Sequence, residues 1–536
     1  MGSEQKPDIS VAMGDLLAFL RAGEPEDETS TETEDAEAFF LSQISDQAGI
    51  VYEKIRNAVD NKEEHFLRRY AIRRIAKRIM WFSDDPKVIT HELLRELYRG
   101  HYLPRNRVSR HTEEGVSRTI YAFLLLSRSV EQYVSAPEFL RLRKHLLDLI
   151  AGAVEDRLYV THSEEAAVRM LARIADDTLD ISGFADLDRE SRALVIYSSA
   201  WRSLFAADSA LLMYKLWLCE DPNWEHADTP SLQAMGKNFP AFVARAERLI
   251  AHDLGKRLIP RIRNYAVAVT VLYELLLRYG VGIENLLHNK ADFDDHVRAI
   301  VIEKYKEDIS RASRKAWRAI TYILATKALL AVVVESLYLS VWKQSVNYVA
   351  VATNIFFHPF VLFFLTSALG APSRKNTDRL TVLVGNIVYG KDLPKITVEP
   401  KKWSIVTDIA LGAYLAVLSA TFAWISLMLS RLDFHPVDIF LFILFLALVL
   451  YFGFRIRYAA RRMELSGTKE GFFRSFMELL ALPIVSVGRW LVIKFERLNF
   501  IAIFMDFFIE LPLKLIFEFF DAFSSVLKEK KDEIYS

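Results

Sequence analysis

The chain has 536 residues, of which 25% are charged and 52% are hydrophobic, and its 68 Lys and Arg residues balance 68 Asp and Glu residues. A formal net charge of zero provides no overall field that would favour nucleic acid or an acidic surface as a partner. The single cysteine, Cys219, excludes an intramolecular disulfide framework and a multi-cysteine metal site.

Residues 1–38 predict a disordered acidic tail that contains one short helix. Ile9–Arg21 has the spacing of an amphipathic helix, and an acidic run rich in Ser and Thr follows it. Low hydrophobicity and dense like charge keep such a run unfolded. The short helix is then either a docking peptide on a flexible tether or a frayed terminus.

Residues 39–315 predict a large all-helical cytosolic domain, because apolar residues recur every three or four positions and no alternating strands stand out. This length buries a real core, as one domain or as two. The expected helices are Ser42–Val59, Lys62–Phe82, Pro86–Arg99, Thr112–Val130, Pro137–Leu158, Glu164–Ala175, Asp188–Leu218, Phe242–Ala251, Pro260–Arg278 and Phe293–Arg311.

The helix expected over Lys62–Phe82 is basic and amphipathic. Such a helix lies on anionic lipid headgroups, or it pairs its basic face with acids elsewhere in the fold. We expect anionic lipid as the partner that would contact this face, and no nucleic acid. The basic residues are Arg68, Arg69, Arg73, Arg74, Lys77 and Arg78.

The stretch Leu249–Pro260 contains adjacent His252 and Asp253, followed by a Gly-Lys pair. It resembles the helix of the HD-domain metal-dependent phosphohydrolases, in which adjacent His and Asp bind a metal that activates water. The resemblance implies His252 and Asp253 as ligands of a divalent metal, with His226 upstream as a third. His226 stands in an apparent loop, where that family presents its first histidine from a helix. The other interpretation is a plain helix end with Gly255 as its stop, and no cofactor is then expected.

Four windows within residues 316–456 are long and apolar enough to cross a bilayer core about 30 Å thick, which needs roughly 20 helical residues. Lys and Arg number six before the first window and one, seven, one and six in the flanks that follow. This alternation predicts four membrane spans with both termini in the cytoplasm and a cytosolic loop over residues 370–404. In a prokaryote the membrane would be the plasma membrane. The windows are Ala319–Val341, Val346–Leu369, Ile405–Leu429 and Val437–Phe454.

Three ionisable residues lie inside these windows, where burying charge in lipid is costly and functional sites are the default interpretation. Lys327 and Glu335 are about 12 Å apart along the first span. His358 lies twelve residues into the second span, level with Lys327. They predict either a polar path through an oligomeric transporter or channel, or side chains that snorkel toward the two membrane faces.

Residues 457–536 predict amphipathic membrane-associated helices followed by a charged C-terminus. Polar residues from Asn499 to Ser525 share one sector of a helical wheel, and apolar residues fill the remainder. These helices either lie in the cytosolic membrane interface or enter the bilayer as a re-entrant hairpin.

The sequence as a whole predicts an all-α, multi-pass helical membrane protein. It contains no phosphate-binding glycine loop, dinucleotide fingerprint or hydrolase nucleophile motif. By elimination we expect a non-enzymatic scaffold or anchoring protein at the cytosolic membrane face, with protein partners and self-association into a homo-oligomer compatible with that role. The alternatives are the oligomeric transporter or channel near Lys327 and His358, and a membrane-tethered HD-type phosphohydrolase.

Overall fold

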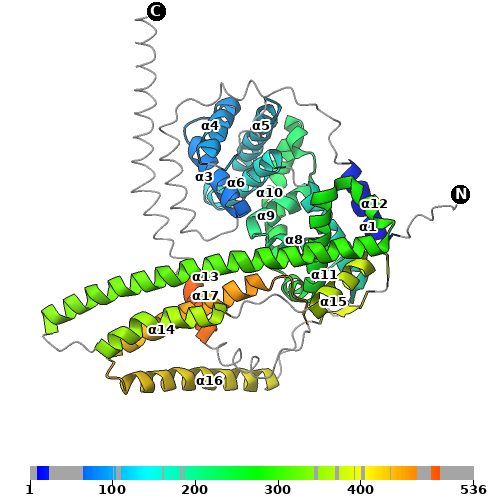
Figure 1. The fold of residues 1–536 in the computed structure, drawn as a ribbon. Coiled ribbons are helices and arrows are strands. Elements are labelled where there is room, and N and C mark those ends of the chain that lie inside the picture. Colours follow the sequence, from blue (N-terminus) through cyan, green and yellow to red (C-terminus); the bar gives the residue numbers. More distant parts are fainter. Residues whose placement is uncertain are drawn as a thin grey trace, which may run out of the picture. The chain divides into compact units, whose positions relative to one another are not determined.

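The computed structural model describes residues 9–22, 64–100, 102–103, 110–159, 162–180, 184, 187–342, 348–367, 374–391, 393–399, 405–434, 436–466 and 484–494. These residues are almost entirely helical, which confirms the all-α class (Figure 1). Strands among them are limited to one short parallel pair, β1 (Leu179–Asp180) and β2 (Ile396–Thr397). The expected helix Ser42–Val59 and, apart from residues 484–494, residues 472–527 lie outside this description.

Backbone contacts divide the fold into two units. The N-terminal unit comprises Ile9–Ile262 and Leu393–Glu399, and the C-terminal unit comprises Arg263–Asp392 and Pro400–Asn499. The helices of the N-terminal unit are α1 (Val11–Ala22), α3 (Glu64–Ile79), α4 (Pro86–Arg99), α5 (Arg110–Tyr133), α6 (Ala136–Leu158), α7 (His162–Thr178), α8 (Arg189–Phe205), α9 (Ser209–Glu220), η3 (Trp224–His226) and α10 (Thr229–Ala251).

The tail helix α1 is ordered against its own domain. Met13, Leu16 and Leu17 are buried where α1 packs on α7, and Asp15 forms an ion pair with Arg173 at 2.9 Å. The apolar stripe of the predicted amphipathic helix therefore docks within the chain.

The sequence predicts one helix over Asp188–Leu218, whereas the structure has two. The backbone turns at Ala206, whose φ of 52° is left-handed, and Asp208 then starts α9 by accepting a hydrogen bond from the Leu211 N–H at 2.9 Å. The new helix begins at its own capping side chain, so the boundary between the two helices contains neither Gly nor Pro.

Helix α10 is longer than the helix predicted over Phe242–Ala251. Asp228 caps it by accepting from the Ser231 N–H at 3.1 Å, and proline at the first helical turn is favourable because no backbone N–H is needed there. Pro240 lies inside the helix. The residues before the predicted helix are therefore a cap followed by about three and a half additional turns, Thr229–Ala241.

The C-terminal unit is built on one long helix. It holds the last part of α11 (Asp253–Tyr279), η4 (Gly280–Gly282), α12 (Ile283–Leu287), α13 (Lys290–Trp342), α14 (Tyr348–Ser367), α15 (Arg374–Val388), α16 (Ile405–Ser430), α17 (Pro436–Ala460) and a helix over residues 484–494. The 53 residues of α13 span about 80 Å at 1.5 Å each. They merge the predicted helix Phe293–Arg311 with the first predicted span, because neither Gly nor Pro stands between them.

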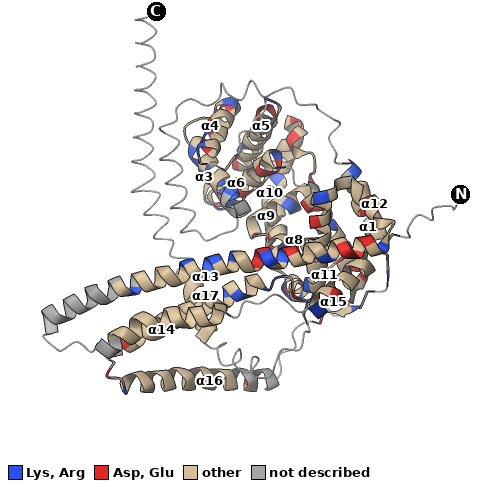
Figure 2. Ribbon diagram, in the orientation of Figure 1, with Lys and Arg blue, Asp and Glu red and all other residues tan. Residues whose placement is uncertain are grey.

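Charge is unevenly distributed over this unit. Figure 2 shows charged residues along the first half of α13 and few of them along α14, α16 and α17. The windows Gly412–Ser430 in α16 and Asp438–Ala460 in α17 are long and apolar enough to cross a membrane, and Val351–Ser367 in α14 is a shorter apolar helix. Only 6% and 28% of the two windows are buried, whereas the core helix of a water-soluble fold would be mostly covered. The structure thus supports membrane association through two helices, and the full count of four spans remains a prediction.

Asn376 joins three segments of the C-terminal unit and is fully buried. Its side-chain amide donates to the Tyr305 hydroxyl at 2.6 Å and to the Met463 carbonyl at 3.2 Å. Its carbonyl oxygen accepts from the Leu465 N–H at 3.0 Å. A satisfied buried amide of this kind fixes the register of α13, α15 and the segment after α17.

Candidate functional site

The first candidate site is a polar cluster of Lys327, Asn354 and His358, contributed by α13 and α14. Lys327 Nζ donates to the backbone oxygen of Asn354 at 3.1 Å and to its side-chain oxygen at 2.7 Å. Nζ also lies 3.1 Å from His358 Nδ1. An ammonium group has three donors, and this cluster supplies three acceptors.

His358 extends the polar cluster to a third helix. Its Nε2 lies 3.0 Å from the carbonyl oxygen of Phe442 in α17. We therefore assign the proton to Nε2, which donates to that oxygen, and leave Nδ1 to accept from Lys327. One imidazole ring thus connects α13, α14 and α17.

The polar cluster is enclosed by apolar side chains. Lys327 is 4% exposed and His358 is 0% exposed. The Phe445 ring centroid lies 4.3 Å from Lys327 Nζ, a distance at which the ring face attracts a cation. Within the described part of the chain, the hydrogen-bond partners of Lys327 Nζ are the two oxygens of Asn354 and Nδ1 of His358. The two nitrogens at 3.1 Å are within reach for direct proton transfer.

The sequence pointed to two of these three residues. Counting along the predicted spans placed His358 level with Lys327, and the structure brings the two together. Asn354 was missed, although it precedes His358 by one helical turn and so shares its face. The side chain of Glu335 lies outside the described residues.

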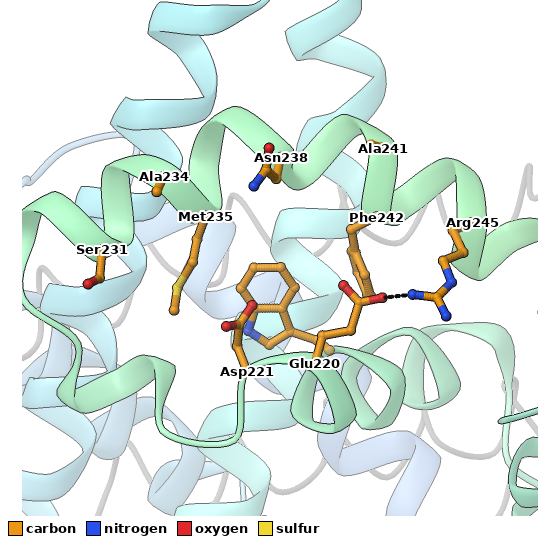
Figure 3. Close-up of a pocket in the computed structure, with 10 residues that line it drawn as sticks. Glu220, Asp221, Ser231, Ala234, Met235, Asn238, Ala241, Phe242 and Arg245 are labelled. Carbon is orange, nitrogen blue, oxygen red and sulfur yellow. Dashed lines mark hydrogen bonds and ion pairs between the residues drawn. The ribbon is translucent and has the colours of Figure 1, made fainter. Parts of the chain in front are cut away.

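The second candidate site is a groove of about 500 Å³ between the end of α9 and α10 (Figure 3). We call it the α9–α10 groove. Trp217 and Phe242 form part of its apolar wall, with ring centroids 5.0 Å apart in an edge-to-face arrangement. The residues that line it are Trp217, Glu220, Asp221, Ser231, Ala234, Met235, Asn238, Ala241, Phe242 and Arg245.

Charged side chains border one end of the groove. Glu220 faces Arg245 (Figure 3), and their charged atoms are 3.0 Å apart. Arg245 is also paired with Glu190 at 2.8 Å. Burial raises the pKa of Glu220 and of Asp221 above their ordinary values. The groove thus combines an apolar wall with two carboxylates at its rim.

The sequence alone does not predict this groove, because the helix expected over Phe242–Ala251 leaves out the first thirteen residues of α10. With α10 extended, Ser231, Met235, Asn238, Phe242 and Arg245 recur at three- and four-residue spacing and share one helix face. Once Asp228 is recognised as the cap of α10, this spacing predicts that the five residues share one face.

The basic residues of α3 are directed mainly to acids within the domain. Arg69 lies 3.4 Å from Glu155, and Arg73 lies 2.7 Å from Asp148. Burial raises the pKa of Asp148 to about 6 and that of Glu155 to about 7, against the opposing effect of the arginines. Arg68 also lies 3.8 Å from Glu155, and Arg78 pairs with Glu96. These contacts favour the interpretation of α3 as an internally paired helix over that of a lipid-binding helix.

The three candidate metal ligands, His226, His252 and Asp253, each have a different local environment. His226 ends η3, and His252 Nδ1 accepts from the Leu254 N–H at 3.2 Å between α10 and α11. Asp253 is paired with Arg257 at 2.5 Å. Within the described ranges, no group of three or more His, Cys, Asp or Glu side chains is arranged to hold a metal ion. The geometry therefore gives the phosphohydrolase interpretation no support.

Comparisons with known protein families, with curated proteins and with solved structures find no match to this chain. The function is therefore argued from the chain's own geometry.

Proposed function

We propose that this chain is a four-pass membrane anchor whose cytosolic helical unit binds a segment of a partner protein in the α9–α10 groove. The observation that carries the proposal is the groove itself, which is open, has an apolar wall and is bordered by carboxylates. A volume of about 500 Å³ lies in the range of roughly 300–1,000 Å³ that suits a bound ligand or a few side chains of a peptide.

Two features support the membrane part of the proposal. The apolar helices α16 and α17 leave Trp424, Leu427 and Phe440 exposed, a surface that lipid would cover. The alternation of Lys and Arg along the chain supports four passes with cytoplasmic termini.

The rim chemistry supports a partner segment with a basic residue beside an apolar one. Glu220 has its ion pair with Arg245, whereas Asp221, the next residue, offers a second carboxylate at the same rim. Met235 is partly exposed and offers apolar contact to such a segment, and the buried rings of Trp217 and Phe242 form the wall behind it.

Filling the groove tests this proposal. We expect Asn238→Trp to abolish selection of peptides from a displayed peptide library on the full chain in lipid nanodiscs, because the indole would occupy the groove. The matched control is Lys237→Trp, an exposed neighbour that does not line the groove. Peptides enriched equally on the wild-type chain and on Asn238→Trp would contradict the proposal.

A second candidate function, transport by an oligomer of this chain, is favoured by the polar cluster. A lysine and a histidine in hydrogen-bond contact among apolar helices are unusual, and such residues commonly mark proton or ion paths.

Removing both groups tests the second candidate. We expect Lys327→Leu together with His358→Leu to reduce proton flux into liposomes that contain the full chain at least tenfold if the polar cluster carries protons, measured with an internal pH dye. Equal flux through both proteins would dismiss a path through these residues.

A further inference from the structure

Exposed aromatic residues gather at one end of the N-terminal unit. Trp81 is 70% exposed and Phe82 is 80% exposed, in the turn between α3 and α4. The turn is well formed, since the N–H groups of Trp81 and Phe82 donate to the carbonyls of Arg78 and Ile79. Two large aromatic side chains are thus held out from the fold by ordered backbone.

Neighbouring helix ends extend this surface. The ion pairs Arg69–Glu155 and Arg73–Asp148 show that α3 and α6 are antiparallel, and Arg143 near the start of α6 lies over the Trp81 ring at 5.8 Å. Leu140, one turn before Arg143, is 67% exposed. The start of α6 therefore lies beside the α3–α4 turn.

The surface is the main exposed apolar patch of the described N-terminal unit. Eight large hydrophobic side chains are exposed there. Three of them, Val11, Tyr70 and Tyr121, lie elsewhere. The other five belong to the α3–α4 turn and the helix ends around it, and we call them the aromatic tip. They are Trp81, Phe82, Val88, Tyr133 and Leu140.

Lysines flank the aromatic tip. Lys77, Lys87 and Lys144 are exposed within about two turns of it. Acids also lie there: Asp84 is paired with Arg128 at 3.2 Å and Glu138 with Arg141 at 3.5 Å, Asp85 accepts from the Lys87 N–H as the cap of α4, and Glu131 is exposed. Trp and Phe flanked by lysines match a membrane interface, where the rings sit at headgroup level and cations meet anionic lipid.

We propose that the aromatic tip inserts into the anionic cytosolic surface of the membrane in which the chain is anchored. The inference rests on the proposed membrane anchoring and adds a second, peripheral contact to it. It assigns lipid binding to the turn that follows α3 instead of to the arginine face of α3, which is paired with Asp148 and Glu155.

A fluorescent label on the tip tests the insertion. In the full chain with Cys219→Ser, a single environment-sensitive label is attached at Phe82→Cys, and the protein is placed in nanodiscs that contain phosphatidylglycerol and nitroxide-labelled lipid. We expect the emission of the label to shift to the blue and its intensity to be quenched by the nitroxide. Adding Lys77→Glu and Lys87→Glu should lower the equilibrium constant for insertion of the tip into the membrane roughly fivefold per lysine. Nanodiscs of phosphatidylcholine alone should also give less quenching.

Two further labels separate the possible outcomes. A label at Leu140→Cys probes the same surface from α6 and guards against a local effect of changing Phe82. A label at Phe440→Cys probes the apolar helix α17. Quenching at Phe440→Cys without quenching at either tip position would overturn this inference and leave the anchor intact. Absence of quenching at all three positions would overturn both.

Discussion

Gly488→Ala is expected to separate the helix over residues 484–494 from α17. A Cβ atom at Gly488 would lie 2.7 Å from the carbonyl carbon of Ala447 and 2.9 Å from Cβ of Tyr451, and closer still to the Ala447 oxygen. Because the obstacle is backbone, the helices must move apart, at about 3 kcal/mol, the upper end for overpacking. Hydrogen exchange of residues 484–494, measured by mass spectrometry on the full chain in detergent, should accelerate about 100-fold.

Gly412→Ala is the matched control in α16. A Cβ atom there meets nothing within 4 Å, so exchange of α16 should stay unchanged or slow down, because Ala favours helix over Gly by about 1 kcal/mol. Equal effects of the two substitutions would show that close packing at Gly488 does not hold the helix in place.

Arg69→Met is expected to destabilise the N-terminal unit by about 3–5 kcal/mol, the usual loss when one partner of a buried ion pair is removed. The Arg69 side chain is 5% exposed and faces Glu155 at 3.4 Å and Asp208 at 3.6 Å. The reporter is hydrogen exchange of α3 and α6 in the full chain. Because burial already raises the pKa of Glu155 to about 7, the loss should be smaller at pH 6, where this carboxyl is more protonated, than at pH 8.

Two variants control for Arg69→Met. Arg110→Met removes an ion pair with Glu114 whose side chains are 80% and 65% exposed, and such surface pairs contribute at most about 1 kcal/mol. Adding Glu155→Leu to Arg69→Met should restore much of the stability, since no buried charge is then left without its partner. A double variant as unstable as Arg69→Met alone would contradict this account.

The bounds of a helix can be predicted from the sequence where a capping residue and a proline mark its start. The helix predicted over Pro86–Arg99 has those bounds in the structure, because Asp85 caps it and proline suits its first turn. Asp208 and Asp228 cap helices in the same way, but the predicted boundaries do not use these two caps. The prediction therefore joins α8 to α9 and leaves out the face of α10 that lines the groove.

The candidate sites depend on tertiary contacts to different degrees. The level of His358 relative to Lys327 follows from counting residues along two helices, and it places the polar cluster. The Phe442 carbonyl that orients the imidazole lies 84 residues from His358, and no local pattern points to it. Likewise, no residue near Arg73 in the sequence indicates that Asp148 faces it. From sequence alone, a basic helix paired with acids inside the fold therefore cannot be distinguished from one that binds lipid.

The uninterrupted course of α13 has a mechanical consequence. The helix contains neither Gly nor Pro from Lys290 to Trp342, so it has no hinge at which a twist of one end could be absorbed. A turn by one residue of register rotates every side chain on the rod by about 100°. Rotation of the helix about its axis would therefore move the Lys327 ammonium away from Asn354 and His358. The hydrogen bonds of that lysine and the bond between Tyr305 and Asn376 both oppose such a rotation.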